Sequence, residues 1–143
     1  MENKELVLKA FEAMRSAYAP YSGYKVGAAL LTESGRVFTG CNIENAAYSP
    51  SVCAERTAIF KAVSEGETKF LKIAVCGGKD GEPDDYFYPC GVCRQVMAEF
   101  CGADFVIVTA KSPGDFREST LGEMLPSAFT PEKVGNQELG VRG

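Results

Sequence analysis

The feature that most narrows the folds open to this chain is its alternation of helical and extended apolar patterns. Apolar residues recur at helical spacing in three segments, which predicts amphipathic helices at 6–17, 53–65 and 91–100. Shorter apolar runs with the character of β-strands lie between and after them, at 26–31, 37–43, 70–76 and 104–109. The first two runs flank a Glu-Ser-Gly-Arg turn and predict a hairpin. The order helix, hairpin, helix, strand, helix, strand indicates an α/β fold.

The chain is expected to form one domain. Its 143 residues, 45% of them hydrophobic, suit a single core, and neither an internal repeat nor a linker divides them. Segment 77–89 is rich in glycine, proline and acidic residues and predicts a loop, while 121–125 predicts a short last helix. Segment 132–143 lacks periodicity, so we expect a domain over 1–131 and a flexible tail over 132–143.

Charge and hydropathy limit the partners. The formal net charge of −4 argues against a nucleic-acid polymer, because such binding depends on Lys and Arg neutralising phosphates. A small, uncharged molecule suits this chain better. The longest apolar run near the N-terminus, 26–31, is far too short to cross roughly 30 Å of hydrocarbon. We therefore expect no membrane partner, and we expect a cytoplasmic location.

The chain contains no histidine. This absence excludes Ser-His-Asp and Cys-His mechanisms, and any zinc site must be built from cysteines and carboxylates. Six cysteines are present without a secretory signal, which favours thiols or metal ligands over disulfides. Cys41, Cys76 and Cys101 stand beside apolar or small residues and are expected to be buried hydrophobic side chains.

The remaining three cysteines occupy two segments in which a loop becomes a helix, Cys53-Ala54-Glu55-Arg56 and Pro89-Cys90-Gly91-Val92-Cys93-Arg94. A helix N-terminus favours the thiolate, which is the form that binds zinc. Three thiolate ligands leave a fourth position open, and this is typical of catalytic zinc. Glu55 is close enough in sequence to move protons at that position, and the combination is a known mark of zinc deaminases.

Two arginines are candidates for tuning this site. A zinc ion with three thiolates carries a net charge of −1, which weakens its power to acidify water. Arg56 and Arg94 are placed to donate hydrogen bonds to sulfur and offset this charge. Alternatives remain open: both arginines can be solvated surface charges, and Cys-x-x-Cys also serves redox sites and structural zinc modules that bind other proteins.

Five segments, taken in their order along the chain, resemble a known family and include more than the metal ligands. They are Pro20-Tyr21-Ser22, Gly27-Ala28-Ala29-Leu30, Cys41-Asn42-Ile43-Glu44-Asn45-Ala46, Cys53-Ala54-Glu55-Arg56-Thr57-Ala58 and Pro89-Cys90-Gly91-Val92-Cys93-Arg94-Gln95. With them the chain closely resembles the small cytidine deaminases over residues 5–130. The resemblance implies a mixed five-stranded sheet sandwiched by helices, one Zn²⁺ per subunit and a homotetramer with active sites shared between subunits. It also implies hydrolysis of cytidine and 2′-deoxycytidine to uridine and 2′-deoxyuridine with release of ammonia, as in pyrimidine salvage.

The resemblance further implies roles for individual residues. Asn42 and Glu44 match a pair that binds the ribose 3′-hydroxyl. Tyr24 matches an aromatic that flanks the pyrimidine, although Phe is usual there. The other expected substrate contacts are the backbone of Ala54, next to Cys53, and three residues that reach a neighbouring subunit's pocket: Ala46, Tyr48 and Phe129.

Other activities stay open within and beyond this class. A blasticidin-S-type deaminase shares the metal segments, although Asn42 and Glu44 favour a plain ribose. Editing of a polynucleotide fits an acidic chain poorly. Tyr24 and the long 77–88 loop leave the preference among nucleosides undecided.

Overall fold

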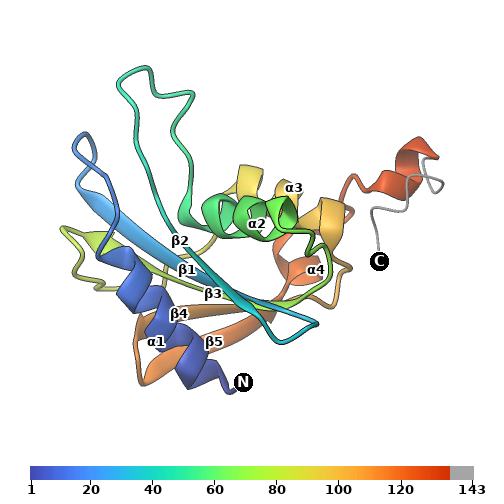
Figure 1. Ribbon diagram of the computed structural model, residues 1–143, viewed down its shortest axis with the longest axis horizontal. Coiled ribbons are helices and arrows are strands. Elements are labelled where there is room, and N and C mark those ends of the chain that lie inside the picture. Colours follow the sequence, from blue (N-terminus) through green and yellow to red (C-terminus); the bar gives the residue numbers. More distant parts are fainter. Residues whose placement is uncertain (136–143) are drawn as a thin grey trace.

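Five strands form one mixed sheet at the centre of the molecule (Figure 1). The computed structural model describes residues 1–135. In spatial order the strands are β2 (Val37–Cys41), β1 (Tyr24–Thr32), β3 (Phe70–Lys79), β4 (Val106–Ser112) and β5 (Asp115–Thr120). Only β3 and β4 are parallel among these neighbours; the other three pairs are antiparallel. The predicted α/β fold with a mixed five-stranded sheet is therefore confirmed.

Helices cover both faces of this sheet, as Figure 1 shows. On one face lies α1 (Asn3–Met14); on the other lie α2 (Ala54–Ser64), α3 (Gly91–Phe100) and the short α4 (Leu121–Met124). A 3₁₀ helix follows at Pro131–Val134. Within residues 1–135, no helix is long and apolar enough to cross a membrane.

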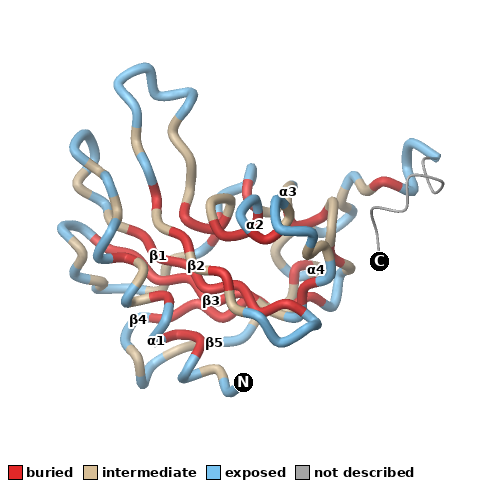
Figure 2. The backbone as a smooth tube through the Cα atoms, in the orientation of Figure 1, coloured by how far each residue is buried: buried red, intermediate tan, exposed pale blue. Residues whose placement is uncertain are grey.

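Strand β1 supplies side chains to both cores, because successive strand residues point to opposite faces. Ala28 and Leu30 pack with α2 and α3, whereas Ala29 and Leu31 pack with α1. The buried backbone in Figure 2 runs along the central strands and the inner sides of the helices. Two cores on one doubly covered sheet explain why this strand is apolar along almost its whole length.

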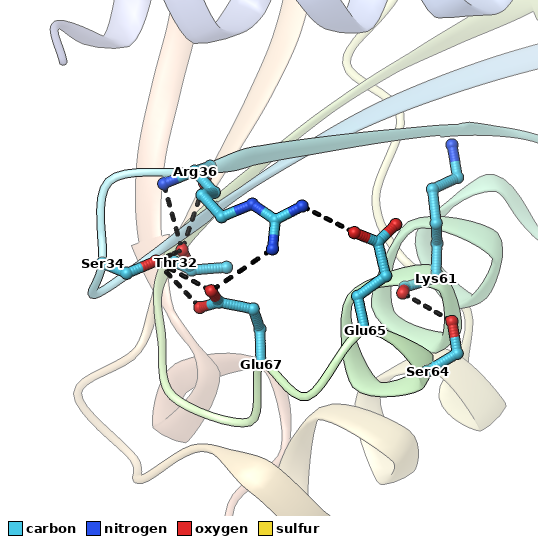
Figure 3. Close-up of polar contacts among 7 residues, drawn as sticks. All are labelled: Thr32, Ser34, Arg36, Lys61, Ser64, Glu65 and Glu67. Atoms are coloured by element: carbon cyan, nitrogen blue, oxygen red, sulfur yellow. Dashed lines mark hydrogen bonds and ion pairs between the residues drawn. The ribbon is translucent and has the colours of Figure 1, made fainter.

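The hairpin turn between β1 and β2 is tied to the loop after α2 by a polar cluster (Figure 3). Arg36 Nη2 lies 2.6 Å from Glu65 Oε1, and its Nη1 lies 3.6 Å from Glu67 Oε2. Ser34 Oγ donates to both oxygens of Glu67, at 2.9 and 3.0 Å. These contacts lie at the end of β1 that is farthest from Tyr24.

Several boundaries differ from the sequence predictions. Strand β5 was not predicted from the apolar pattern, because this edge strand is mostly polar and solvent-facing. Strand β3 continues through Gly77 and Gly78 to Lys79, inside the predicted loop. Helix α1 ends at Met14, and residues 15–17 continue only as turns. Most of the tail expected over 132–143 lies outside the described residues, so the boundary at 131 stays a prediction.

Candidate metal centre and substrate cavity

The three cysteines of the predicted metal site come together at two helix N-termini. Cys53 is the N-cap residue of α2, and Cys90 is the N-cap residue of α3. Cys90 Sγ lies 3.6 Å from Cys53 Sγ and 3.5 Å from Cys93 Sγ. All three sulfur atoms lie within 4.8 Å of one another.

This sulfur triangle fits a zinc ion. Zinc–sulfur bonds of about 2.3 Å in a tetrahedral arrangement place the sulfur atoms about 3.8 Å apart. The two short separations, 3.5 and 3.6 Å, are close to that value. Three thiolates leave the fourth tetrahedral position free, so the residues present can hold one zinc ion as an open site.

The thiols differ in how readily they ionise. Hydrogen bonding with Cys93, then with Arg56 and Cys90, lowers the pKa of Cys53 to about 5, against the opposing effect of burial. The contact with Cys53, together with burial, raises the pKa of Cys93. In the metal-free protein Cys53 is therefore the first of these two to become a thiolate.

The two arginines have different partners. Arg56 Nη2 donates to Cys53 Sγ at 3.4 Å, as predicted. The prediction that Arg94 donates to sulfur is wrong: its Nε donates to the Pro89 carbonyl at 2.7 Å and its Nη1 to the Met124 carbonyl at 2.8 Å. These two bonds tie the chain just before Cys90 to the end of α4.

Glu55 is buried at the same site. Its side chain is only 1% exposed, and its Oε1 has no hydrogen-bond partner among the described residues. Burial raises the pKa of Glu55 to about 7. A buried carboxylate with one unpartnered oxygen is costly, so its presence beside three thiols indicates a group that serves a bound molecule.

A cavity of about 340 Å³ opens onto Glu55 and two of the thiols. This volume is within the range of small-molecule sites. Seven residues singled out from the sequence line it: Tyr24, Asn42, Glu44, Cys53, Glu55, Arg56 and Cys90. The third thiol, Cys93, is fully buried behind them, as is Ala54.

Asn42 and Glu44 are held by backbone near the start of β1. The Asn42 side chain accepts from Val26 N at 2.8 Å and donates to the Tyr24 carbonyl at 2.7 Å. Glu44 accepts from the backbone of Tyr21 and Ser22, at 2.9 and 3.1 Å, and from the Ser22 hydroxyl. That hydroxyl is the main cause that lowers the pKa of Glu44, which therefore faces the cavity as a carboxylate acceptor.

Besides the buried Ala54, three residues predicted to contact substrate do not line this chain's own cavity. Ala46 and Tyr48 lie in the exposed segment between β2 and α2, and Phe129 lies after α4. Tyr48 is 72% exposed and Phe129 is 64% exposed. Their predicted role was in a neighbouring subunit, which a single chain does not test.

The cavity also includes residues that sequence reasoning did not single out, chiefly Ser22, Phe87 and Tyr88. Ser22 belongs to the quoted Pro20-Tyr21-Ser22 segment but received no role. Phe87 and Tyr88 stand in the segment predicted only as a loop, directly before Pro89 and Cys90. Two aromatic residues among glycines and acids next to a metal ligand are the signal that could have found them.

Together, the open three-thiolate site, the buried carboxylate and the polar pair across the cavity define a zinc-dependent hydrolytic enzyme site on an α/β scaffold. Comparison with known proteins narrows this class. Residues 1–109 match the family described as "Cytidine and deoxycytidylate deaminase zinc-binding region". The chain therefore belongs to the cytidine and deoxycytidylate deaminase family.

Similar proteins extend over nearly the whole chain. A cytidine deaminase of Sporosarcina psychrophila is 46% identical over 134 residues, covering 94% of this chain and 96% of its own. One from Halalkalibacterium halodurans is 47% identical over 137 residues, covering 95% of this chain and all of its own. The crystal structure of cytidine deaminase from Burkholderia pseudomallei is 46% identical, with a TM-score of 0.83, and covers 90% of this chain and all of its own.

Proposed function

We propose that this protein hydrolyses cytidine and 2′-deoxycytidine to uridine and 2′-deoxyuridine with release of ammonia, a step of pyrimidine salvage. The observation that carries the proposal is Glu55, a buried carboxylate with an unpartnered oxygen beside three thiols, facing a cavity of nucleoside size. Relatives named cytidine deaminase at 46–47% identity over nearly the full chain support the choice of substrate.

The chemistry needs a nucleophile and a carrier of protons. When bound by Cys53, Cys90 and Cys93, zinc supplies the Lewis acidity that makes water nucleophilic at neutral pH. Glu55 as a carboxylate accepts a proton from that water and delivers it to N3 of cytosine while the oxygen bonds to C4. Glu55 then transfers the second water proton to the amino group as the C4–N bond breaks. One water is consumed, one ammonia leaves, and the carboxylate is regenerated.

The other end of the cavity suits a sugar. Glu44 presents a carboxylate that can accept a hydrogen bond from a ribose hydroxyl, and Asn42 also lines the cavity. Both side chains are already fixed by β1 and the segment before it, so little side-chain entropy is lost on binding. Tyr24 adds an aromatic surface at the mouth.

A structural zinc module is the main alternative of another class. Such a site normally closes its fourth position with another Cys or His. The chain has no histidine, and within residues 1–135 no fourth cysteine joins the cluster and Glu55 Oε1 has no partner. The buried carboxylate and the adjoining cavity therefore favour catalysis over a structural role.

We also propose a cytoplasmic homotetramer in which each cavity is completed by a neighbour. The exposure of Tyr48 and Phe129, two aromatic side chains away from this chain's own cavity, supports this arrangement. Sedimentation gives the number of subunits. Mixing the separately inactive variants Glu55→Gln and Phe129→Ala, then allowing subunits to exchange, should restore part of the activity; no recovery after proven exchange contradicts shared sites.

The activity itself is tested with zinc-quantified protein and cytidine, following loss of cytosine absorbance and release of ammonia together. Turnover of cytidine and 2′-deoxycytidine is expected. Zinc-loaded protein that binds but does not convert either nucleoside would overturn the proposal and point to a modified cytosine nucleoside instead.

A further inference from the structure

The segment between β3 and α3 is anchored to β5, a strand that does not pair with β3. Tyr86 Oη donates to Asp115 Oδ1, and the Arg117 guanidinium carbon lies 3.9 Å from the centre of the Tyr86 ring. Asp115 and Arg117 belong to β5, and β4 separates β5 from β3 in the sheet. The segment therefore reaches past β4 and is fixed at its far side.

The same segment lies directly on β3. A Cβ at Gly78 would stand 2.5 Å from the Glu82 carbonyl oxygen, and one at Gly77 would stand 3.0 Å from Phe87 Cδ2. Both glycines thus make room for the residues that fold back over them. Residues 80–89 therefore contact both β3 and β5, and we call this segment the wall.

This wall ends in the cavity. Phe87 packs against the core on the α2 side, and Phe87 and Tyr88 both line the cavity. The phenol of Tyr88 also interacts with Arg117, and this interaction is the main cause that raises the pKa of that guanidinium. Tyr88 thus lines the cavity and also interacts with a residue of β5.

The position of Tyr88 in the chain indicates which end of a substrate it borders. Only Pro89 separates Tyr88 from the metal ligand Cys90, and Arg94 pins the Pro89 carbonyl. The sugar-binding candidates Asn42 and Glu44 come from a different segment. Because the reacting C4 must lie at the metal, a cavity-lining residue so close in sequence to Cys90 favours contact with the C4 and C5 side of the base over contact with the sugar.

We infer that Tyr88 is a specificity-determining residue that limits the size of the C5 substituent on the base, and that Arg117 is a positioning residue that acts through Tyr88. The inference rests on the proposed deaminase function. It assigns part of the substrate selection to an edge strand outside the cavity.

The test compares kcat and KM for cytidine, 5-methylcytidine, 5-ethylcytidine and 5′-O-methylcytidine. Tyr88→Ala should raise kcat/KM for 5-ethylcytidine relative to cytidine by about tenfold, the usual effect of one or two carbon atoms in a pocket. The ratio for 5′-O-methylcytidine relative to cytidine should stay unchanged, and so should the zinc content.

Arg117 is tested by a change that leaves the ring in place. Arg117→Ala should move the same ratio in the same direction by about threefold, mainly through KM, and Arg117→Lys should restore part of the selectivity. Tyr88→Phe keeps the ring and loses the hydroxyl, so it should resemble Arg117→Ala. Adding Arg117→Ala to Tyr88→Phe should then have little further effect.

Arg36→Ala is the matched control. Like Arg117, Arg36 is a solvent-facing arginine over an aromatic ring, 4.7 Å from the centre of the Phe38 ring. It belongs to the cluster of Figure 3 and does not line the cavity. It should leave every ratio unchanged. Tyr21→Ala removes another exposed tyrosine, one outside the cavity lining, and serves the same purpose for Tyr88.

Equal changes for all four nucleosides, or a gain confined to the 5′-O-methyl compound, would overturn the inference. If Tyr88→Ala does not fold, Tyr88→Leu replaces it. Failure of the proposed function is recognised separately, because wild-type protein with full zinc would then not convert cytidine. In that event the same ratios are measured as binding affinities by calorimetry, with the same expected and contrary results.

Discussion

Glu55 is the residue whose environment departs furthest from that of an ordinary carboxylate. It is almost completely buried, and one of its oxygens has no partner in the described part of the chain. Glu55→Gln keeps the size of the side chain but cannot accept or deliver a proton. We expect turnover of cytidine to fall by about 10²- to 10⁴-fold, the usual contribution of a general acid–base group, with zinc content and nucleoside binding retained.

The Glu55→Gln measurement needs zinc stoichiometry and calorimetric binding beside the rate. If the variant loses zinc as well as activity, Glu55 has a structural role at the metal. Turnover within a few-fold of wild type would remove Glu55 from the mechanism.

For Arg94 we expect a substitution to affect stability instead of catalysis. It donates to two backbone carbonyls, those of Pro89 and Met124, and thereby links the start of α3 to α4. Arg94→Ala should lower the free energy of unfolding by about 2–3 kcal/mol, since bonds from a charged donor contribute about 1.5–3 kcal/mol each and water replaces part of them. Urea unfolding of the zinc-loaded protein measures this change.

The matched variant for Arg94→Ala is Arg56→Ala, because Arg56 does contact sulfur. In cobalt-substituted protein, the thiolate-to-metal absorption should shift in Arg56→Ala and stay at its wild-type position in Arg94→Ala. A shift in both variants with no loss of stability in Arg94→Ala would return Arg94 to the role predicted from the sequence.

Arg56 and Arg94 show which side-chain contacts could be predicted from the sequence and which could not. The positions of Cys53, Glu55 and Arg56 could be predicted because one helix turn fixes them relative to one another. Arg94 could not, since its direction depends on Met124, 30 residues later in the chain. Tyr88 was missed for a similar reason: its partner Arg117 lies on a strand that the apolar pattern did not reveal.

At the scale of helices and strands, two glycines let α1 and α2 approach the sheet closely. Substituting each glycine in turn separates the role of α1 from that of α2. A Cβ at Gly40 in β2 would stand 2.5 Å from the Ala54 carbonyl oxygen and 2.6 Å from Ala58 N, both in α2. A Cβ at Gly27 in β1 would stand 2.0 Å from the Ala10 carbonyl oxygen in α1. Each clash is with backbone, so a whole helix must move.

Gly40→Ala and Gly27→Ala should each destabilise the protein by about 1–3 kcal/mol, the usual cost of overpacking. Only Gly40→Ala displaces the helix that carries Cys53 and Glu55. We therefore expect it alone to lower zinc affinity and turnover per folded molecule, as measured by metal titration and rates at saturating zinc. Equal losses of turnover in both variants would contradict this separation.

The element boundaries that prediction missed share a physical cause. Strand β5 pairs only with β4, and its outward side chains are polar, so neither period nor hydrophobicity distinguishes it from a loop. The end of β3 contains two glycines, which usually indicate a turn. In the structure they stay extended because residues 82–87 pack over them. Both cases depend on tertiary contacts that local patterns do not contain.

Across the whole chain, the sheet and the metal join parts that are remote in sequence. The two sheet faces carry separate cores; Cys53 and Cys93 belong to the core formed with α2 and α3, whereas Cys90 is exposed at its edge. Cys53 and Cys90 are 37 residues apart, yet their sulfur atoms are 3.6 Å apart. A zinc ion bound to both would hold the starts of α2 and α3 together, so metal binding should stabilise the fold as well as the site.

Removal of zinc should therefore lower the melting temperature. A ligand present at 100 times its Kd stabilises a protein by about 2.7 kcal/mol, and for a chain of this length each kcal/mol corresponds to about 2–4 °C. We expect a fall of about 5–10 °C on treatment with a strong chelator, reversed by added zinc. Differential scanning calorimetry measures this fall.

Two variants serve as controls for zinc removal. Cys90→Ser should melt near the metal-free temperature and respond little to chelator, whereas Cys41→Ser, outside the sulfur cluster, should respond like wild type. A chelator that abolishes turnover without moving the melting temperature would mean that the protein's two helix starts are already fixed by packing, and that zinc contributes to the chemistry alone.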